Sequence, residues 1–289
     1  MIPGRFDYHL PRSMDEALAM LAQYGEDARP LAGGHSLIPM MKLRLAEPAH
    51  LIDLRGLGDL KGIREASGRI RIGAMTTQAE VIASALLAEK CPILPEASAL
   101  IADPQVRYVG TVGGNVANGD PGNDLPAVMM ALGADFVLRG KGGERTVAAK
   151  DFYEGTYATA LKPGELLAEV HFPAPLAGHG YAYRKMKRKV GDYAIAAAAV
   201  VLNLKGGTCE RASIALTNLG PTPIFAAAAG QALAGTKLDA AAVERAVGLA
   251  VALAEPATDM RGPADFRRHV AGVMTRRAIE TARDRAKGA

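Results

Sequence analysis

The sequence has no tryptophan and only two cysteines, Cys91 and Cys209, among its 289 residues. Two cysteines cannot supply the ligands of a structural zinc or an iron–sulfur cluster, so we expect no metal site of that kind in this chain. The longest apolar run, at residues 194–202, is far shorter than the roughly 20 residues of a membrane helix. The first ten residues also lack the basic and apolar regions of a signal peptide. These absences predict a cytoplasmic protein of a reducing compartment.

Aromatic residues are scarce: there are 8 tyrosines and 6 phenylalanines, against 55 alanines. Hydrophobic residues still make up 49% of the chain, which excludes disorder and predicts a core of small, closely packed side chains. The 34 basic and 30 acidic residues give a net charge of +4, which is too small and too dispersed to indicate nucleic-acid binding.

Helix and turn signals predict an α+β fold. Ser13 and Glu16 match a capping box, and the helix that they begin should end near Tyr24 because Gly25 can stop it. Residues 173–180, PAPLAGHG, interrupt the hydrophobic periodicity of helices and strands, and we place a domain boundary there. Further helices are expected at 77–87, 96–102, 125–132 and 225–233, and after Asp239 and Pro263. Strands are expected at 29–31, 50–54, 70–73, 135–139, 144–148, 181–189, 200–204 and 212–217.

Two glycine pairs are the first indication of function. Ala32-Gly-Gly-His-Ser36 comes directly after an expected strand, and Thr111-Val-Gly-Gly-Asn115 has a similar make-up. Consecutive glycines allow backbone N–H groups to approach an anion closely, so each turn could hold one phosphate of a pyrophosphate. Taken singly, each pair could equally be an ordinary tight turn. No G-x-G-x-x-G pattern accompanies them, so a Rossmann dinucleotide site is not supported.

The segment after the second glycine pair is rich in side-chain oxygens. Asn118, Asp120, Asn123 and Asp124 lie within seven positions. Such residues also cap turns and helices, and Asp124 stands where it could cap a helix that begins at Leu125. A calcium loop is a rival interpretation, but the expected order of acidic residues followed by glycine and a later glutamate is absent.

These residues belong to longer segments that resemble the FAD-binding medium subunits of the molybdenum hydroxylases, the xanthine dehydrogenase family. The likeness is strongest to the aerobic carbon monoxide dehydrogenase type, and it extends over practically the whole chain. The T-x-G-G-N-x-A-N-x-D-P-x-x-D-L-P run is its most specific part. The matching segments are AGGHSLIPMMKLRLAEPAHLIDL (32–54), IGAMTT (72–77), LIADPQVRYVGTVGGNVANGDPGNDLPA (100–127), KRKVGDYA (187–194), IALTNL (214–219) and RGPADFRRHVAGVMTRRA (261–278).

The resemblance implies a two-lobed FAD-binding domain of the vanillyl-alcohol-oxidase (PCMH) type at 1–176, with lobes of about 1–56 and 57–176. A C-terminal domain at 177–289 would hold a three-stranded antiparallel sheet packed on helices. No catalytic residue is expected, and His35 is interpreted as a cofactor contact. The FAD-binding residues that the resemblance implies are Ala32, Gly33, Gly34, His35, Ser36, Leu37, Thr111, Val112, Gly113, Gly114, Asn115, Asp124, Leu167, Lys187 and Tyr193.

The implied function is electron transfer. A large subunit would oxidise carbon monoxide to carbon dioxide at a molybdenum cofactor. A small subunit with two 2Fe–2S clusters would pass the electrons to FAD on this chain, and they would leave to a quinone or another acceptor. The complex would be a dimer of heterotrimers, compatible with association at the inner face of the cytoplasmic membrane.

Three alternatives remain open from the residues. The chain could serve a hydroxylase of aromatic N-heterocycles, because the substrate never touches this subunit. It could be a stand-alone flavin oxidase, although no His–Cys pairing suited to a covalent flavin is evident. It could also be a scaffold without FAD, against which the intact glycine turns argue.

Overall fold

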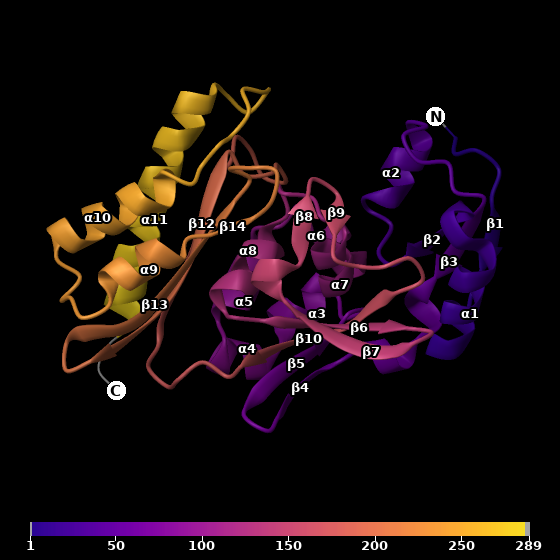
Figure 1. Ribbon diagram of the computed structural model, residues 1–289, viewed down its shortest axis with the longest axis horizontal. Coiled ribbons are helices and arrows are strands. Elements are labelled where there is room, and N and C mark those ends of the chain that lie inside the picture. Colours follow the sequence, from indigo (N-terminus) through magenta and orange to yellow (C-terminus); the bar gives the residue numbers. More distant parts are fainter. Residues whose placement is uncertain (1, 287–289) are drawn as a thin grey trace.

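The computed structural model describes residues 2–286. Its first lobe is a parallel sheet in the order β1-β3-β2, with α1 packed against it and α2 beyond the end of β2 (Figure 1). The predicted strands at 29–31 and 50–54 and the helix after Ser13 are confirmed here; β1 has no sequence signal that we recognised. The bounds are β1 Asp7–His9, α1 Met14–Tyr24, β2 Ala28–Leu31, α2 Leu37–Lys42 and β3 His50–Asp53.

The second lobe is an antiparallel sheet in the order β4-β5-β10-β6-β7, with six helices on one side of it (Figure 1). Its central strand β10 was not predicted as a strand. The strands are β4 Ile63–Ala66, β5 Arg69–Gly73, β6 Asp135–Gly140, β7 Gly143–Ala148 and β10 Leu166–Pro173, with a small hairpin β8 Tyr153–Gly155 and β9 Ala158–Thr159. The helices are α3 Gln78–Ala83, α4 Ala85–Lys90, α5 Ile93–Ala99, α6 Pro104–Val109, α7 Val112–Ala117 and α8 Asp124–Ala131.

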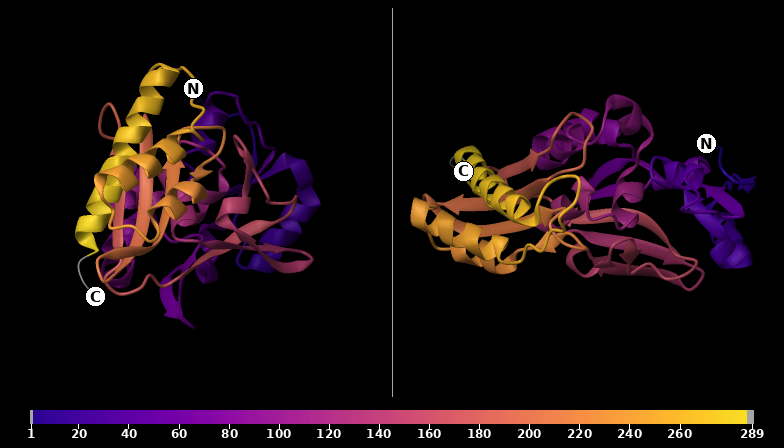
Figure 2. Two further views of the ribbon diagram at one scale, coloured as in Figure 1. Left: turned by 60° about the vertical axis from the view of Figure 1, so that its left-hand side comes forward. Right: turned by 90° about the horizontal axis from the view of Figure 1, so that it is seen from above.

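The C-terminal part has the three predicted antiparallel strands and a two-residue fourth strand at the edge. Its own helices cover one face of the sheet, and α5 and α8 of the second lobe pack on the other (Figure 2). The bounds are β11 Gly180–Met186, β12 Ala196–Lys205, β13 Thr208–Thr217, β14 Ile224–Phe225, α9 Ala227–Leu233, α10 Ala240–Val251 and α11 Ala264–Arg285. The division at 56 and 176 into lobes and domains stays a prediction.

The predicted use of small side chains is clearest in β12. Ala197 and Ala199 belong to the core shared with the second lobe, whereas Ala196 and Ala198 face the C-terminal helices. Successive residues of a strand point to opposite faces, so four alanines in a row supply two cores at once. Helices can then approach both faces of this sheet closely, and one such helix, α8, brings Asp124 against β11.

Several local predictions are wrong. The helix expected at 77–87 is interrupted because Ser84 is extended (ψ 113°) and its hydroxyl caps a second helix through the Leu87 N–H. The Thr111–Asn115 segment is the start of helix α7 and not a turn. Asp124 is the first residue of α8 and not its cap, which is Asn123. Helix α5 covers Ile93–Ala99 where 96–102 was expected, and β11 ends at Met186, three residues before the predicted end.

Candidate functional site

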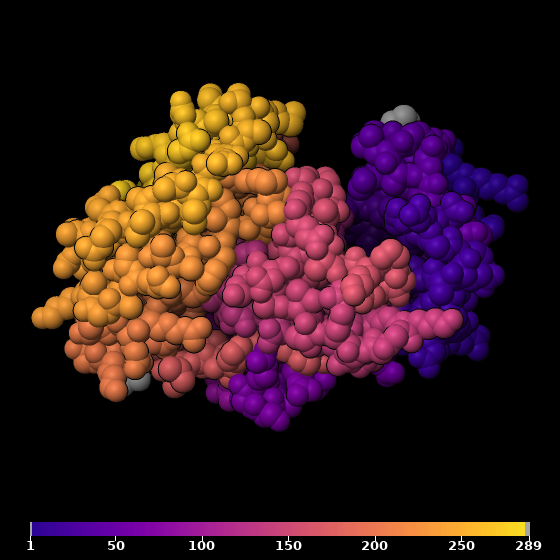
Figure 3. Space-filling view, viewed as in Figure 1, coloured from indigo at the N-terminus to yellow at the C-terminus, as the bar shows by residue number. Residues whose placement is uncertain are grey.

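A pocket of about 580 Å³ lies where the two N-terminal lobes meet the edge of the C-terminal sheet. The space-filling view shows the hollow between the first lobe and the hairpin region of the second lobe (Figure 3). Its walls come from the segment after β2, from α7 and the loop that follows it, and from β10, β11 and the loop after β11. A pocket of this size is within the range that encloses a large organic cofactor.

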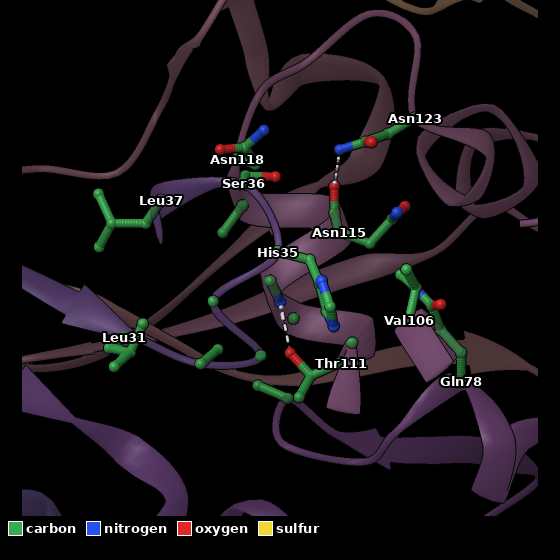
Figure 4. Close-up of a pocket in the computed structure, with 18 of the residues that line it drawn as sticks. Leu31, His35, Ser36, Leu37, Gln78, Val106, Thr111, Asn115, Asn118 and Asn123 are labelled. Atoms are coloured by element: carbon green, nitrogen blue, oxygen red, sulfur yellow. Dashed lines mark hydrogen bonds between the residues drawn. The ribbon is translucent and has the colours of Figure 1, made fainter. Parts of the chain in front are cut away.

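The first glycine turn presents free hydrogen-bond donors to this pocket. Within residues 2–286, the backbone N–H groups of the five residues 33–37 donate to no protein acceptor. Gly34 adopts a φ of +74°, which a residue with a side chain rarely adopts, and this bend turns the chain from β2 into α2. His35 projects from the turn into the pocket (Figure 4). The turn is therefore suited to bind an anion such as a pyrophosphate.

The second glycine segment uses its donors differently. The Thr111 hydroxyl accepts a hydrogen bond from the Gly114 N–H at 2.9 Å, which caps α7 (Figure 4). The N–H groups of Val112 and Gly113 donate to carbonyls of the β5–α3 connection at 2.9 and 2.8 Å. The N–H groups of residues 112–115 already have acceptors within the protein, so they are not free to bind a phosphate as those of the first turn are, and a phosphate contact at this segment stays a prediction. The segment supplies a close-packed wall.

The two glycine segments lie next to each other, as a shared pyrophosphate site requires. A Cβ atom on Gly114 would lie 3.5 Å from the Ala32 Cβ atom. Both segments line the same pocket although they are 79 positions apart in the sequence. Two hydrogen bonds fix the loop after α7. The Asn123 side-chain amide donates to the Asn115 backbone carbonyl at 2.8 Å, and the Asn115 side-chain oxygen accepts from the Leu125 N–H at 3.3 Å.

Two buried polar atoms of the pocket wall have no partner within residues 2–286. They are the Gln78 Oε1 acceptor and the Asn118 Nδ2 donor. A buried polar group without a hydrogen bond is costly, and such atoms in a pocket indicate that a bound molecule supplies the partner. Together with the free N–H groups of residues 33–37, they fit a ligand that carries both phosphates and polar ring edges.

Asp124 is a buried carboxylate at the inner end of the pocket. Its Oδ1 atom accepts a hydrogen bond from the Tyr183 hydroxyl at 2.5 Å, and its Oδ2 atom accepts one from Lys185 Nζ at 2.8 Å. Burial raises the pKa of the Asp124 carboxyl, whereas the Lys185 charge and the two hydrogen bonds oppose that rise. The side chains of Asp124 and Lys185 are 4% and 1% exposed, so this is a fully buried ion pair.

Tyr193 lines the outer part of the pocket together with Tyr157 from the β8–β9 hairpin. The Arg261 guanidinium lies 5.6 Å from the centre of the Tyr193 ring, a cation–π arrangement. Burial and the nearby Asp120 carboxylate raise the pKa of the Tyr193 phenol above its ordinary value. Tyr193 therefore stays neutral at physiological pH.

The structure brings thirteen of the fifteen predicted residues to this pocket, and two do not line it. The Val112 side chain is fully buried in the core of the second lobe. Lys187 donates to the Leu100 carbonyl at 3.4 Å, and burial and the neighbouring Lys185 lower its pKa. The thirteen are Ala32, Gly33, Gly34, His35, Ser36, Leu37, Thr111, Gly113, Gly114, Asn115, Asp124, Leu167 and Tyr193.

Sequence reasoning missed several wall residues. Lys185 lies in the basic run whose cofactor contact was assigned to Lys187. The two are two residues apart in the strand predicted at 181–189, so alternation could not separate them. Gln78 follows a helix cap and carries no other signal. The further unpredicted wall residues include Met75, Ile101, Asn118, Asn123, Tyr157, Leu161 and Asp192.

Comparison with known proteins identifies the family. Residues 4–175 match the FAD binding domain in molybdopterin dehydrogenase, and residues 181–282 match the CO dehydrogenase flavoprotein C-terminal domain. The chain belongs to this family of FAD-binding subunits. FAD is accordingly its cofactor, as predicted, and the chain is part of an oxidoreductase. The predicted fold, a PCMH-type FAD-binding domain followed by the flavoprotein C-terminal domain, is also confirmed.

Three similar proteins define its place within the FAD-binding subunits. The carbon monoxide dehydrogenase medium chain of Afipia carboxidovorans is 61% identical, covering 99% of this chain and 100% of that one. A chain in the crystal structure of the cyanide-inactivated Cu,Mo-CO dehydrogenase superposes with a TM-score of 0.98 at 61% identity, with the same coverage. A chain of quinoline 2-oxidoreductase from Pseudomonas putida 86 has a TM-score of 0.94 at 36% identity, with both chains fully covered.

Two negative findings concern the part of the chain that the structure describes. No group of three or more histidine, cysteine, aspartate or glutamate side chains in residues 2–286 is arranged to hold a metal ion. No helix there is long and apolar enough to cross a membrane.

Proposed function

We propose that this chain is the FAD-carrying medium subunit of an aerobic carbon monoxide dehydrogenase. The observation that carries the proposal is the 61% identity to the Afipia carboxidovorans medium chain over the full length of both chains. The complete pocket, with its free N–H groups at residues 33–37, supports FAD binding. The complex would catalyse CO + H2O → CO2 + 2 e⁻ + 2 H⁺ on its large molybdenum subunit.

The pocket residues would bind FAD in distinct ways. The N–H groups of residues 33–37 would donate to the pyrophosphate, and the α7 segment would form the wall that excludes water behind it. Leu167 would contribute an apolar contact from β10, and Tyr193 an aromatic one from the loop after β11. We retain the thirteen lining residues as the proposed cofactor contacts, and the geometry gives no support for Val112 or Lys187.

FAD supplies the step that protein side chains cannot, since it accepts electrons singly and delivers them in pairs. Electrons would arrive from the 2Fe–2S clusters of a small partner subunit and leave to a quinone or a comparable acceptor. We propose a dimer of heterotrimers made of large, medium and small subunits. We also propose that it works in the cytoplasm, at the inner face of the membrane when the acceptor is a membrane quinone.

The nearest rival is the FAD subunit of an N-heterocycle hydroxylase. The fold alone does not separate it from this proposal, because the quinoline 2-oxidoreductase chain also superposes over its full length. The test is to supply the purified complex anaerobically with carbon monoxide, quinoline, nicotine or xanthine as the sole electron donor, together with a quinone. We expect quinone reduction with carbon monoxide alone. Reduction by a heterocycle and not by carbon monoxide would move the chain to the rival group.

A stand-alone flavin oxidase is the second rival, and it predicts a different result with the isolated subunit. We expect the FAD of the isolated chain to remain oxidised with each of these donors, since their oxidation takes place on another subunit. Reduction by an organic donor without partner subunits would favour the oxidase. A complex that contains no flavin would leave only a scaffold role.

A further inference from the structure

The inner end of the pocket is held by two side chains that the C-terminal sheet supplies. Tyr183 and Lys185 both lie on β11 and donate to the two oxygens of Asp124, which lies on α8 of the second lobe. The Tyr183 hydroxyl also lies 3.3 Å from the Thr217 hydroxyl of β13. Asp124, a buried carboxylate of the FAD-binding part, is thus fixed by side chains from the other part of the chain.

Lys185 differs from the other basic residues of the segment 184–189. Arg184 donates to Thr281 and Arg188 to Asp192, at or near the surface, whereas the Lys185 side chain is 1% exposed and lines the pocket. Removing the charges of a lysine and an aspartate from water is costly, and their mutual attraction offsets this cost only while both are present. The pair is therefore stable only as a unit, and removal of one partner leaves the other in the wrong state of charge.

The state of charge decides what Asp124 can do for a ligand. An ionised carboxylate only accepts hydrogen bonds, and each oxygen can accept more than the one that it receives here. A protonated carboxyl carries a hydrogen on one of its oxygens. That oxygen would donate a hydrogen bond toward the ligand where the ionised form accepts one. Without the Lys185 ammonium, burial would favour the protonated form, as the raised pKa of Asp124 already indicates.

We propose that Lys185 is a positioning residue that keeps Asp124 ionised and oriented as an acceptor for FAD, so that the C-terminal sheet controls the cofactor site. This inference rests on the proposed role of Asp124 as a cofactor contact. The resemblance implied a cofactor contact for Lys187, whereas this inference gives Lys185 a role at the site through Asp124. Tyr183 fixes the second oxygen and acts in the same sense.

The charged and titratable groups around Asp124 define the pH dependence that follows. They are Lys185 and Tyr183 on β11, Lys187 just beyond its end and Tyr193 on the loop that follows. The phenols of Tyr183 and Tyr193 have raised pKa values and stay neutral near pH 7. With Lys185 present, FAD affinity should vary less with pH than it does in Lys185→Met. In Lys185→Met the carboxyl would take up a proton as the pH falls, and FAD affinity should rise with pH.

The test is a set of FAD dissociation constants for the full complex after flavin removal, followed by fluorescence titration with FAD at several pH values. The variants are Lys185→Met, Asp124→Asn, the double variant, Lys187→Met and, as a matched control on the exposed end of the neighbouring strand, Lys205→Met. We expect Lys185→Met to weaken binding at least about tenfold at pH 6 and less at pH 9. The double variant should lose much less than the sum of the two single changes.

The outcomes separate this inference from the proposed function. If the wild-type complex binds no FAD, the proposed function fails. If it binds FAD and Lys185→Met binds it like Lys205→Met at every pH, the inference is wrong. An equal loss at every pH, with additive effects in the double variant, would mean a merely structural role for Lys185 and would also contradict it. A pH-dependent loss in Lys187→Met alone would restore the assignment to Lys187.

Discussion

Gly33 of the first lobe lies against the backbone of Val109 in the second lobe, so closely that a Cβ atom would sit 2.5 Å from the Val109 carbonyl oxygen and 2.8 Å from the Gly110 Cα atom. The glycine is therefore required for the contact between lobes, in addition to any approach of a phosphate. The sequence argument considered only the phosphate. This contact holds the first glycine turn, residues 33–37, which we call the donor turn, at the pocket.

We expect Gly33→Ala to separate the donor turn from α6 and to lower FAD affinity at least about tenfold, or ~1.4 kcal/mol. The obstructing atoms are backbone and cannot rotate away. The measurement is the FAD content of the purified complex and the dissociation constant on reloading. Gly58→Ala is the matched control, because no atom lies within 4 Å of its added Cβ and its φ is ordinary. Equal FAD binding by both variants would contradict the role of the lobe contact.

Gly114→Val should abolish FAD binding because of close packing around this glycine. Gly114 has no positive φ, so conformational strain is not the cause. An added Cβ would lie 2.9 Å from the Thr111 hydroxyl oxygen that caps α7 and 3.5 Å from the Ala32 Cβ atom. A branched side chain would therefore push the donor turn away from α7. The measurement is the FAD content of the purified variant, and circular dichroism checks that it folds. Full FAD occupancy would show that the donor turn and the start of α7 need not lie side by side.

The ion pair between Arg145 and Glu165 predicts a pH-dependent contribution to stability at the rim of the pocket. Arg145 donates to both Glu165 oxygens at 2.7 Å, and these hydrogen bonds hold the pKa of Glu165 below its ordinary value. A carboxyl with a lowered pKa in the folded protein stabilises it above the unfolded pKa, and this stabilisation is lost as the pH falls through the folded value.

We therefore expect Arg145→Met to lower the free energy of unfolding by about 1 kcal/mol at pH 7, a modest effect because the pair is partly exposed. The difference from wild type should shrink as the pH falls from 5 to 3. Urea unfolding of the isolated chain at these pH values measures it. A difference that stays constant down to pH 3 would show that lost packing, and not charge, causes the effect. Arg139→Met, on the more exposed pair with Glu144, is the control.

The sequence predicted what local signals determine. The helix starts at Ser13, Thr77 and Asp239 and the first glycine turn all lie where their signals indicated. Strand β10 was missed because its neighbours β5 and β6 lie far from it in the sequence, and only the folded sheet brings them together. The pairing of Asp124 with Lys185 could not be predicted, because it depends on a tertiary contact that no spacing shows.

The same difference between local signals and tertiary contacts applies to the site. The glycines of residues 32–36 indicate a turn with free N–H groups from the sequence alone, so this part of the site could be predicted. The different use of donors in the Thr111–Asn115 segment could not be found from the sequence. The N–H groups of Val112 and Gly113 donate to the carbonyls of Thr76 and Ala74, which only the fold brings close. Similarly, two lysines two residues apart on one strand look alike until the end of the strand is known.

The central claim is that this chain carries FAD which receives electrons from carbon monoxide through partner subunits. The most direct test is the visible absorption spectrum of the anaerobic complex, recorded before and after carbon monoxide is added, with the isolated chain measured in parallel. We predict one FAD per chain, whose oxidised band bleaches with carbon monoxide in the complex and stays unchanged in the isolated chain. A flavin band in the complex that carbon monoxide leaves unchanged would contradict the account.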